Sequence, residues 1–513
     1  MNNPFEVVRF IDWWNTLNTS FISIYFVVFL LLILLIYWLM PGKVRWIVLL
    51  FGSLLFYSIC GIKPLIMVVL SSWVTWSCGF ALEKLSTSKK RSRKCLLIAG
   101  IITSLSILIY CKVYSLFDLK YGFIIPLGVS YYTFSSISYL ADIYWKKDEA
   151  EENYFRFLLF VLFFPKILEG PISRHRIIGR QLRCTHRFDY EQFCFGVQRI
   201  LWGYFKKMVI ADRFLVISST IFGNYKNYQG QFFIVGALAS AIQIYCDFSG
   251  CMDIALGVSE CFGITLEENF KRPFFSSGVS EFWRRWHITL GAWFKDYVYM
   301  PIAISPRLLR ITKWVKNHLG VRCSKSFVTI VPLSIVWILT GFWHGTGIDY
   351  LVWGCYWGLL IIISSVFNPE ISLLCKKIRL PINSIGWKKV RIIRTFLLFC
   401  LGRLITVCGT GNLDGCIYAI KSLISHMNIW IWFDKSLYNL GLDRIDFWIG
   451  IVGVALLWMV ECKQEKGIKI RETLSQKPYY IRLIIYICAV LAILVFGMYG
   501  PGFGYSSFVY MQF

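Results

Sequence analysis

The chain has 513 residues, of which 57% are hydrophobic and only 16% are charged. Soluble domains average about 25% charged and 45–50% apolar residues, so the composition excludes a soluble protein and predicts one helical domain integral to a membrane. The formal net charge of +25 does not indicate nucleic-acid binding, because Lys and Arg in the loops of a membrane protein mark its cytoplasmic side.

The first part of the chain alternates apolar spans with basic turns. Residues 1–20 mix apolar and charged side chains, which suits an interfacial helix rather than a cleaved signal peptide, and residues 21–39 are long enough to cross a bilayer core. Residues 46–60 and 64–82 predict a hairpin, and the basic run 89–94 follows it. The positive-inside rule therefore predicts that this end of the hairpin is cytoplasmic and that the N-terminus lies outside.

The next segment contains a break at membrane depth. Residues 96–110 and 124–144 predict two further spans, and residues 154–168 are apolar but run into prolines 165 and 171. A break of this kind is tolerated only where it is buried in protein or lines a cavity. We therefore expect a re-entrant segment near 164–171, followed by an amphipathic helix at 190–214 on the cytoplasmic face.

The second half of the chain predicts more spans and two basic loops. Residues 307–325 hold six Lys or Arg residues and no acidic one, and residues 376–394 are also basic, so both are expected to be cytoplasmic loops. The apolar stretches that predict spans lie at 232–250, 252–262, 327–339, 351–367, 395–407, 447–461 and 481–498. The sequence thus predicts an all-α, polytopic integral membrane protein with about ten to twelve transmembrane helices, plus re-entrant and interfacial helices.

Two of the six histidines lie inside aromatic-rich membrane segments. They are His287 and His344, and an ionisable side chain in such a place is costly and suggests function. Imidazole has an ordinary pKa of about 6.5, so it accepts a proton from a hydroxyl at neutral pH and can return it to a leaving group. A proton relay or a metal ligand is an equal alternative. The other histidines are expected to be solvated surface residues, and these are His175, His186, His318 and His426.

The segment 280–299 around His287 has no clean apolar face. Aromatic residues alternate there with charged ones, which predicts a wet cavity inside the protein. If the segment is helical, Trp283 and Phe294 lie on the His287 side. Glu281 can then form an ion pair with a following arginine, and the two candidates are Arg284 and Arg285.

Asp247 and Ser249 interrupt another apolar span. One interpretation makes the Asp247 carboxylate a group that orients a histidine or a substrate. The other makes it a structural charge that Arg284 or Arg285 neutralises. None of the 17 cysteines belongs to a Cys-x-x-Cys pair or a Cys/His set at zinc spacing, so we expect buried, reduced thiols and no metal site.

Six blocks of sequence, in order, resemble the signature blocks of the membrane-bound O-acyltransferases. The closest resemblance is to the bacterial branch of alginate O-acetyltransferase membrane subunits, with the teichoic-acid D-alanyl transferases as cousins. The blocks are FPKILEGPISR (164–174), YCDFSG (245–250), NFKRPF (269–274), EFWRRWHITL (281–290), DYVYMP (296–301) and GFWHG (341–345).

The resemblance implies a ring of helices around a central funnel whose floor holds the histidines. His344 matches the most characteristic histidine of the family, and His287 matches a second one that this branch carries. Five further residues, Asp247, Ser249, Arg284, Arg285 and Asp296, match motif positions with less settled roles, and Trp343 adjoins His344 as substrate or structural support. One departure is Trp357, in Tyr356-Trp357-Gly358, where this branch often has Tyr-His-Gly.

The resemblance also implies a reaction. An acyl group, expected to be acetyl from acetyl-CoA on the cytoplasmic side, would reach hydroxyls of a secreted or cell-envelope polysaccharide. His344 would act as general base, and His287 would position the acyl carbonyl or assist proton transfer. Arg284 and Arg285 are candidates for binding donor phosphates. No bound cofactor is implied, and an extracytoplasmic partner of the serine-esterase type would complete the transfer.

The blocks span the middle of one domain that covers residues 1–513 of a bacterial plasma-membrane protein. An interfacial helix is expected at 1–20, N-terminal spans at 21–160, a catalytic core with the motif blocks at 161–367 and C-terminal spans at 368–513. Two other functions remain as alternatives. A secondary transporter would explain intramembrane charges but predicts inverted repeats, which the sequence lacks, and a scaffold for polysaccharide export would tolerate loss of both histidines.

Overall fold

The structure is a computed structural model that describes residues 20–116, 126–382, 384–409 and 411–499. Helices form the whole of its regular structure, and in the part of the chain described here the only bridge of β type pairs Phe270 with Trp286. The all-α prediction is therefore confirmed. The interfacial helix predicted at 1–20 lies outside the described residues, apart from Ser20.

The helices of the N-terminal half follow the predicted spans closely, including the hairpin of α3 and α4. They are α2 (Ile24–Leu39), α3 (Arg45–Ser58), α4 (Ile62–Lys84), α5 (Lys90–Leu116), α6 (Val129–Tyr144), α7 (Tyr154–Leu162), α8 (Phe164–Ile167), α9 (His175–Arg183), α10 (Tyr190–Tyr204), the π-helix η2 (Phe205–Ala211) and α11 (Asp212–Gly223).

The helices of the C-terminal half include the three longest of the described residues, which are α12, α16 and α17. They are α12 (Phe232–Cys261), η4 (Pro273–Phe275), α13 (Val279–Arg285), α14 (Ile288–Phe294), the π-helix η5 (Lys295–Tyr299), α15 (Met300–Ala303), α16 (Pro306–His344), α17 (Ile348–Lys377), α18 (Ile385–Val407), α19 (Leu413–Ser425), α20 (Arg444–Glu465), α21 (Ile470–Ser475) and α22 (Tyr479–Phe496).

Seven helices in the described residues are long and apolar enough to cross a membrane: α4, α5, α12, α16, α17, α20 and α22. The shorter apolar helix α2 has only 16 residues. The chain is thus a polytopic membrane protein as predicted, with fewer spans of full length than the ten to twelve expected from apolar stretches. The stretches 232–250 and 252–262 form the single helix α12, and the helices α3 and α6 have only 14 and 16 residues. The break between α7 and α8 also interrupts the stretch 154–168.

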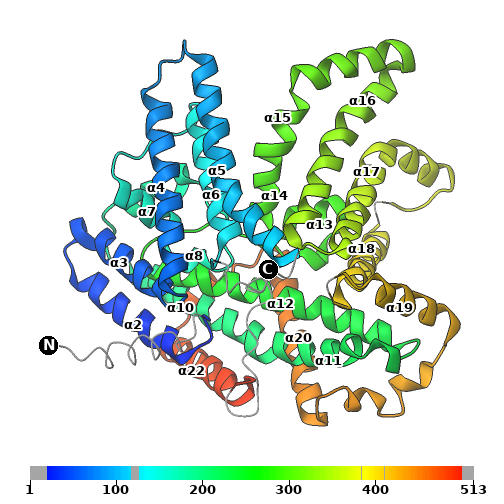
Figure 1. The fold of residues 1–513 in the computed structure, drawn as a ribbon. Helices are drawn as coiled ribbons and strands as arrows, with labels where there is room; N and C mark the ends of the chain where they lie inside the picture. Colours follow the sequence, from blue (N-terminus) through cyan, green and yellow to red (C-terminus); the bar gives the residue numbers. More distant parts are fainter. Residues whose placement is uncertain (1–19, 117–125, 383, 410, 500–513) are drawn as a thin grey trace.

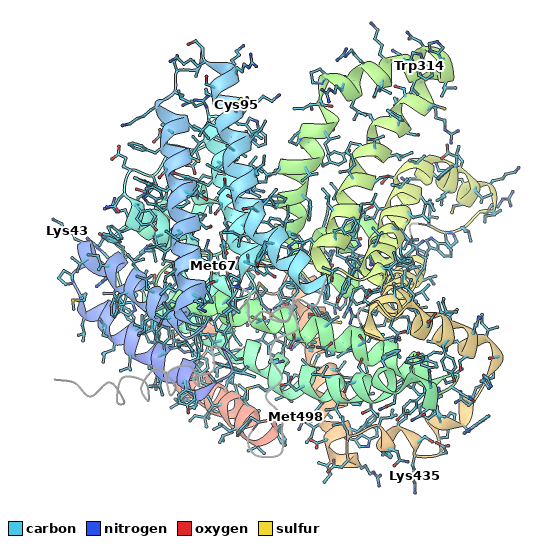
Figure 2. The ribbon with its side chains drawn as sticks, viewed as in Figure 1. Lys43, Met67, Cys95, Trp314, Lys435 and Met498 are labelled. Atoms are coloured by element: carbon cyan, nitrogen blue, oxygen red, sulfur yellow. The ribbon has the colours of Figure 1, made fainter. Side chains whose placement is uncertain are left out.

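The segment 307–325 is helical, which corrects the prediction of a loop. Helix α16 begins at Pro306 and passes through Gly320, whose φ of 87° breaks it into two parts. In Figure 1 this break lies at the top of the view, as does the turn between α4 and α5. Figure 2 accordingly labels Trp314 and Cys95 at the same end of the molecule. The two basic segments therefore lie on one side, as the positive-inside rule requires.

Helix α12 forms the centre of the fold, with α10 packed along it (Figure 1). Glycines make this contact close: a Cβ added to Gly196 or Gly203 of α10 would come within 2.6 Å of a backbone oxygen of α12. Residues 206–214 of the predicted helix 190–214 are consequently part of the core. The two lysines among them, Lys206 and Lys207, are buried against α12.

The break predicted near 164–171 is buried in protein, as expected for a break at membrane depth. Residues 161–170 are all buried, including the short helix α8 and the turn that follows it. The neighbouring helix α6 supplies a buried apolar face made of Tyr131, Phe134 and Ile137, which packs against Trp293 and Phe294. This packing brings the 164–174 block next to the region of His287.

Candidate active site

His344 is the last residue of α16, where α16 and α17 come into close contact. A Cβ added to Gly341 would lie 2.7 Å from the backbone oxygen of Tyr350, and one added to Gly345 would overlap the Tyr350 ring. Only glycine permits this approach, which explains why His344 stands between two of them. The tight turn holds the His344 ring against Trp353 of α17, with the ring centroids 4.8 Å apart.

His344 faces a cavity of about 380 Å³. The cavity lies between α11, α12 and the ends of α16, α17 and α18, and those ends are remote from the basic segments 307–325 and 376–394. Among the described residues that line it there is no Asp or Glu. Its polar lining comprises Ser218, Ser219, Ser240, Gln243, Tyr350, Arg403 and Thr406.

His287 stands at a break between α13 and α14, not within one helix. Its φ of 47° is left-handed, a region that non-glycine residues seldom occupy. The conditional expectation of a continuous helix over 280–299 is therefore wrong. The chain turns here because residues 269–271 run alongside it: Lys271 N–H donates to Arg285 O, and Ile288 N–H donates to Asn269 O.

Asn269 fixes the tautomer of His287. The Asn269 Oδ1 atom accepts hydrogen bonds from Thr289 N–H at 3.1 Å and from Thr289 Oγ1 at 3.0 Å, so it acts as an acceptor. The Nδ1 atom of His287 lies 3.2 Å from the same oxygen and must donate to it. The His287 ring is buried, and with Nδ1 donating to Asn269, the Nε2 atom of the neutral ring is an acceptor.

Trp343 joins the two histidines. Its ring centroid lies 5.8 Å from that of His287 and 4.6 Å from that of His344. It also contacts Tyr131 and Phe134 of α6, which close the far side of the His287 region. The structure therefore brings together three of the residues singled out in the sequence, from the two blocks around 287 and 344.

Asp247 and Ser249 are engaged by Lys207 and Lys206, two cations that the interpretations from the sequence did not name. Asp247 is completely buried and accepts a hydrogen bond from Lys207 Nζ at 2.6 Å, and Lys207 also pairs with Asp212 at 2.9 Å. Ser249 Oγ accepts from Lys206 Nζ at 2.9 Å. Arg285, one of the two cations suggested for Asp247, pairs with Glu281 and Glu465.

The remaining motif residues form other pairs. Arg285 pairs with Glu281 at 2.7 Å, as expected for positions four apart on a helix, and with Glu465 of α20 at 3.1 Å. Arg284 is exposed. Asp296 pairs with Arg174 at 2.7 Å and so links the 296–301 block to the 164–174 block.

Trp357 occupies the position where this branch often has a histidine. It is only 1% exposed and packs in an aromatic cluster against Phe282 at 6.0 Å, Trp283 at 5.1 Å and Phe399 at 6.3 Å. It does not line the His344 cavity. The side chain at this position therefore fills the core behind the site.

His175 is buried, although the sequence predicted a surface histidine. Its Nδ1 atom lies 2.8 Å from Asp148 Oδ2, and its Nε2 atom lies 3.7 Å from Glu151 Oε2. Burial alone lowers the pKa of His175, but the hydrogen bonds and charges of these two carboxylates outweigh it and raise that pKa above its usual value. The cluster connects α9 to the loop after α6.

Sequence reasoning missed Asn269, Arg403 and the lysine pair Lys206 and Lys207. Asn269 is the first residue of the NFKRPF block that the sequence analysis identified, but its hydrogen bond with His287 was not predicted. The two lysines lie in a mostly apolar part of the chain, and the next two predicted spans contain one aspartate each, with no assigned partner. These two features together could have suggested the pairing. In the described residues no three His, Cys, Asp or Glu side chains gather as metal ligands.

Comparison with known proteins connects this site to an enzyme family. Residues 150–401 match the model of the MBOAT, membrane-bound O-acyltransferase family, and this range contains both histidines. A probable alginate O-acetylase of Pseudomonas fluorescens is 31% identical over 398 residues, which cover 77% of this chain and 74% of that protein.

More distant relatives act on other envelope polymers, according to their names. A peptidoglycan O-acetyltransferase of Helicobacter pylori is 28% identical over 360 residues, covering 63% of this chain and 64% of that protein. A teichoic acid D-alanyltransferase of Bacillus subtilis is 28% identical over 283 residues, covering 54% of this chain and 67% of that protein.

Proposed function

This chain belongs to the membrane-bound O-acyltransferase family, as its six sequence blocks predicted, and from that premise we propose that it O-acetylates a polysaccharide of the bacterial cell envelope. The donor would be acetyl-CoA, bound from the cytoplasmic side. The acceptor would be a hydroxyl of the polysaccharide, or a nucleophile of an extracytoplasmic, esterase-like partner that passes the acetyl group on. The names of the relatives support this class of substrate.

The observation that carries the proposal is the position of His344 at the cavity of about 380 Å³. The cavity lies at the helix ends remote from the basic segments, which are expected in the cytoplasm. An acceptor that enters from outside would therefore reach His344 without passing through the donor side. The hydroxyl-rich and amide lining of Ser240, Gln243 and Thr406 suits a sugar.

In the proposed reaction His344 acts as general base. It takes the proton of the acceptor hydroxyl while the oxygen attacks the thioester carbonyl carbon of the donor. The new C–O bond forms, the C–S bond breaks, and the proton passes to the leaving thiolate. Neutral imidazole suits both proton transfers, because its ordinary pKa lies near the operating pH.

His287 would assist proton transfer in this scheme. Its Nδ1–H is directed at Asn269, so in the neutral ring Nε2 is an acceptor and does not donate to the acyl carbonyl. Contact with Trp343 keeps it beside His344. Of the two roles that the sequence left open for His287, the tautomer favours proton transfer.

The donor phosphates need another partner than Arg285. Its guanidinium already pairs with Glu281 and Glu465, which supports a structural role. Arg284 is exposed and remains a candidate for the donor.

The experiment that tests the proposal measures base-labile acetate on envelope and secreted polysaccharide. It compares cells with the wild-type protein, cells with His344→Ala and cells without the protein, with the membrane level of both forms checked. We expect the acetate of His344→Ala cells to fall to the level of the null strain. If acetate depends on the protein but His344→Ala equals wild type, the mechanism is wrong and a scaffold role is favoured.

A further inference from the structure

Two arginines near the start of α18 converge on one residue of the loop before α13. Arg391 Nη2 donates to Ser277 Oγ at 2.7 Å, and Arg391 Nε lies 3.4 Å from Ser277 O. Arg394 Nη2 lies 3.3 Å from the same carbonyl oxygen. Two like charges are thus held beside one neutral residue, and an anion placed there would be attracted to both of them.

Neither guanidinium has an acidic partner in the part of the chain that the structure describes. None of its ion pairs includes Arg391 or Arg394, whereas Arg272 and Arg285 nearby share Glu465. The nearest carboxylate, Glu281, binds Ser277 N–H and Oγ and is itself paired with Arg285. Burial and the charge of Arg391 together hold the pKa of Arg394 below its usual value.

The loop opposite the arginines offers a further polar group and open space. Ser276 is only 1% exposed, and its Oγ has no hydrogen-bond partner among the described residues. A Cβ added to Gly278 would meet no atom within 4 Å. Buried hydroxyls are normally satisfied, so a missing partner of this kind calls for a ligand or an ordered water.

We propose that Arg391, Arg394 and the 276–278 loop form a binding site for a phosphate group. Two guanidiniums present several N–H donors in the fork geometry that matches phosphate oxygens. A phosphate bound there would offset the positive charge of the two guanidiniums and provide an acceptor for the Ser276 hydroxyl. The site lies outside the His344 cavity, and none of its residues lines that cavity.

The surroundings favour the headgroup of an anionic phospholipid as the source of that phosphate. On α18, Arg394 adjoins an exposed apolar face of Val390, Ile393 and Leu397. Acyl chains would cover this face while the headgroup reached the arginines. The segment 376–394 is expected at the cytoplasmic leaflet, where basic pockets between membrane helices bind such headgroups.

A phosphate bound at this site would restrict the motion of the segment that leads to His287. Ser277 lies two residues before α13, and α13 ends two residues before His287. A phosphate that clamps the loop to α18 would therefore restrain the same segment that carries the histidine. The soluble donor also contains phosphates, so the test must separate it from a lipid.

The test uses the full-length protein purified in detergent and two probes, phosphatidylglycerol and coenzyme A, with phosphatidylcholine as the zwitterionic reference of zero net charge. The shift in thermal unfolding temperature with each probe gives an apparent affinity, and native mass spectrometry counts retained phosphatidylglycerol. The variant Arg391→Gln/Arg394→Gln is compared with the matched control Lys388→Gln/Lys389→Gln. The control removes the same charge from exposed positions on the same helix.

We expect phosphatidylglycerol to bind the wild type and the control alike and to bind the arginine variant at least about tenfold more weakly. Should the double variant fail to fold, Arg394→Gln alone is used, because it removes one contact of 3.3 Å and leaves Arg391 in place. Equal binding to variant and wild type, or an equal loss in the lysine control, overturns the site. Arginine-dependent binding of coenzyme A without phosphatidylglycerol overturns the lipid source and assigns the phosphate to the donor.

Discussion

Lys207 donates a hydrogen bond of 2.6 Å to Asp247 in the completely buried middle of α12. A second carboxylate, Asp212, lies 2.9 Å from the same ammonium. This cluster ties η2 to α12, which supports a structural role for Asp247 of the 245–250 block. Removing one member leaves an uncompensated buried charge, which costs more than the pair itself contributes.

We therefore predict that Lys207→Met destabilises the protein by about 3–5 kcal/mol. Asp247→Asn has the same direction of effect, and the double variant costs less than the sum of the two. Denaturant unfolding of the purified protein in detergent measures all three. A double-mutant cycle with no coupling would contradict this account, and Lys388→Met serves as the exposed control.

A second prediction concerns Trp357. Because its indole fills the core between α13, α17 and α18, Trp357→His leaves a cavity and buries an unmatched polar ring. We expect a loss of stability on the order of 3 kcal/mol, and a smaller loss for Trp357→Phe, which keeps an aromatic ring. Equal stability of Trp357→His and wild type would show that the position tolerates the histidine frequent in this branch.

A third prediction is a pH-dependent contribution of His175 to stability. The pKa of His175 is raised in the folded state, so folding favours its charged form. Its partners are Asp148 and Glu151, and Glu151 also forms an ion pair with Arg183. The contribution is fully present below the unfolded pKa of about 6.5 and is lost as pH rises through the raised folded value. Unfolding temperatures of wild type and His175→Gln between pH 5.5 and 9 should converge as pH increases. A constant difference would argue for packing alone.

A fourth prediction identifies Asn269 as a positioning residue for His287. Asn269→Leu removes the oxygen that accepts from His287 Nδ1 and from Thr289, so His287 loses its tautomer and orientation. We expect kcat to fall about ten- to hundredfold with little change in the KM for the donor. Asn269→Asp keeps an acceptor oxygen and should recover most of the rate. If both variants lose activity equally, the effect is one of folding.

The sequence predicted the class of fold and the identity of the site better than it predicted local geometry. The sequence singled out the histidine of GFWHG, and the structure shows why glycines flank it: α16 and α17 approach closely at this turn. The break at His287 did not follow, since the left-handed conformation depends on residues 269–271 lying alongside, and this contact is not local. The helical start of α16 was missed because charge density identifies the side of a membrane and does not exclude a helix.

The buried ion pairs were the least predictable part. The sequence offers several cations as ion-pair partners for Asp247. Which of them pairs with it depends on the glycine contacts that bring α10 and η2 against α12. The same applies to His175, whose partners come from the loop after α6. Pairing across helices needs the packing as well as the residue types.

The most direct test of the central claim is the initial rate of label transfer from radiolabelled acetyl-CoA to polysaccharide. Membranes with wild-type protein, His344→Gln and the matched surface control His318→Gln are compared at equal protein level. We predict that His344→Gln loses a factor of about 10²–10⁴, as expected for a general base, while His318→Gln retains the wild-type rate. A His344→Gln rate equal to wild type would contradict the assignment of His344 as the base.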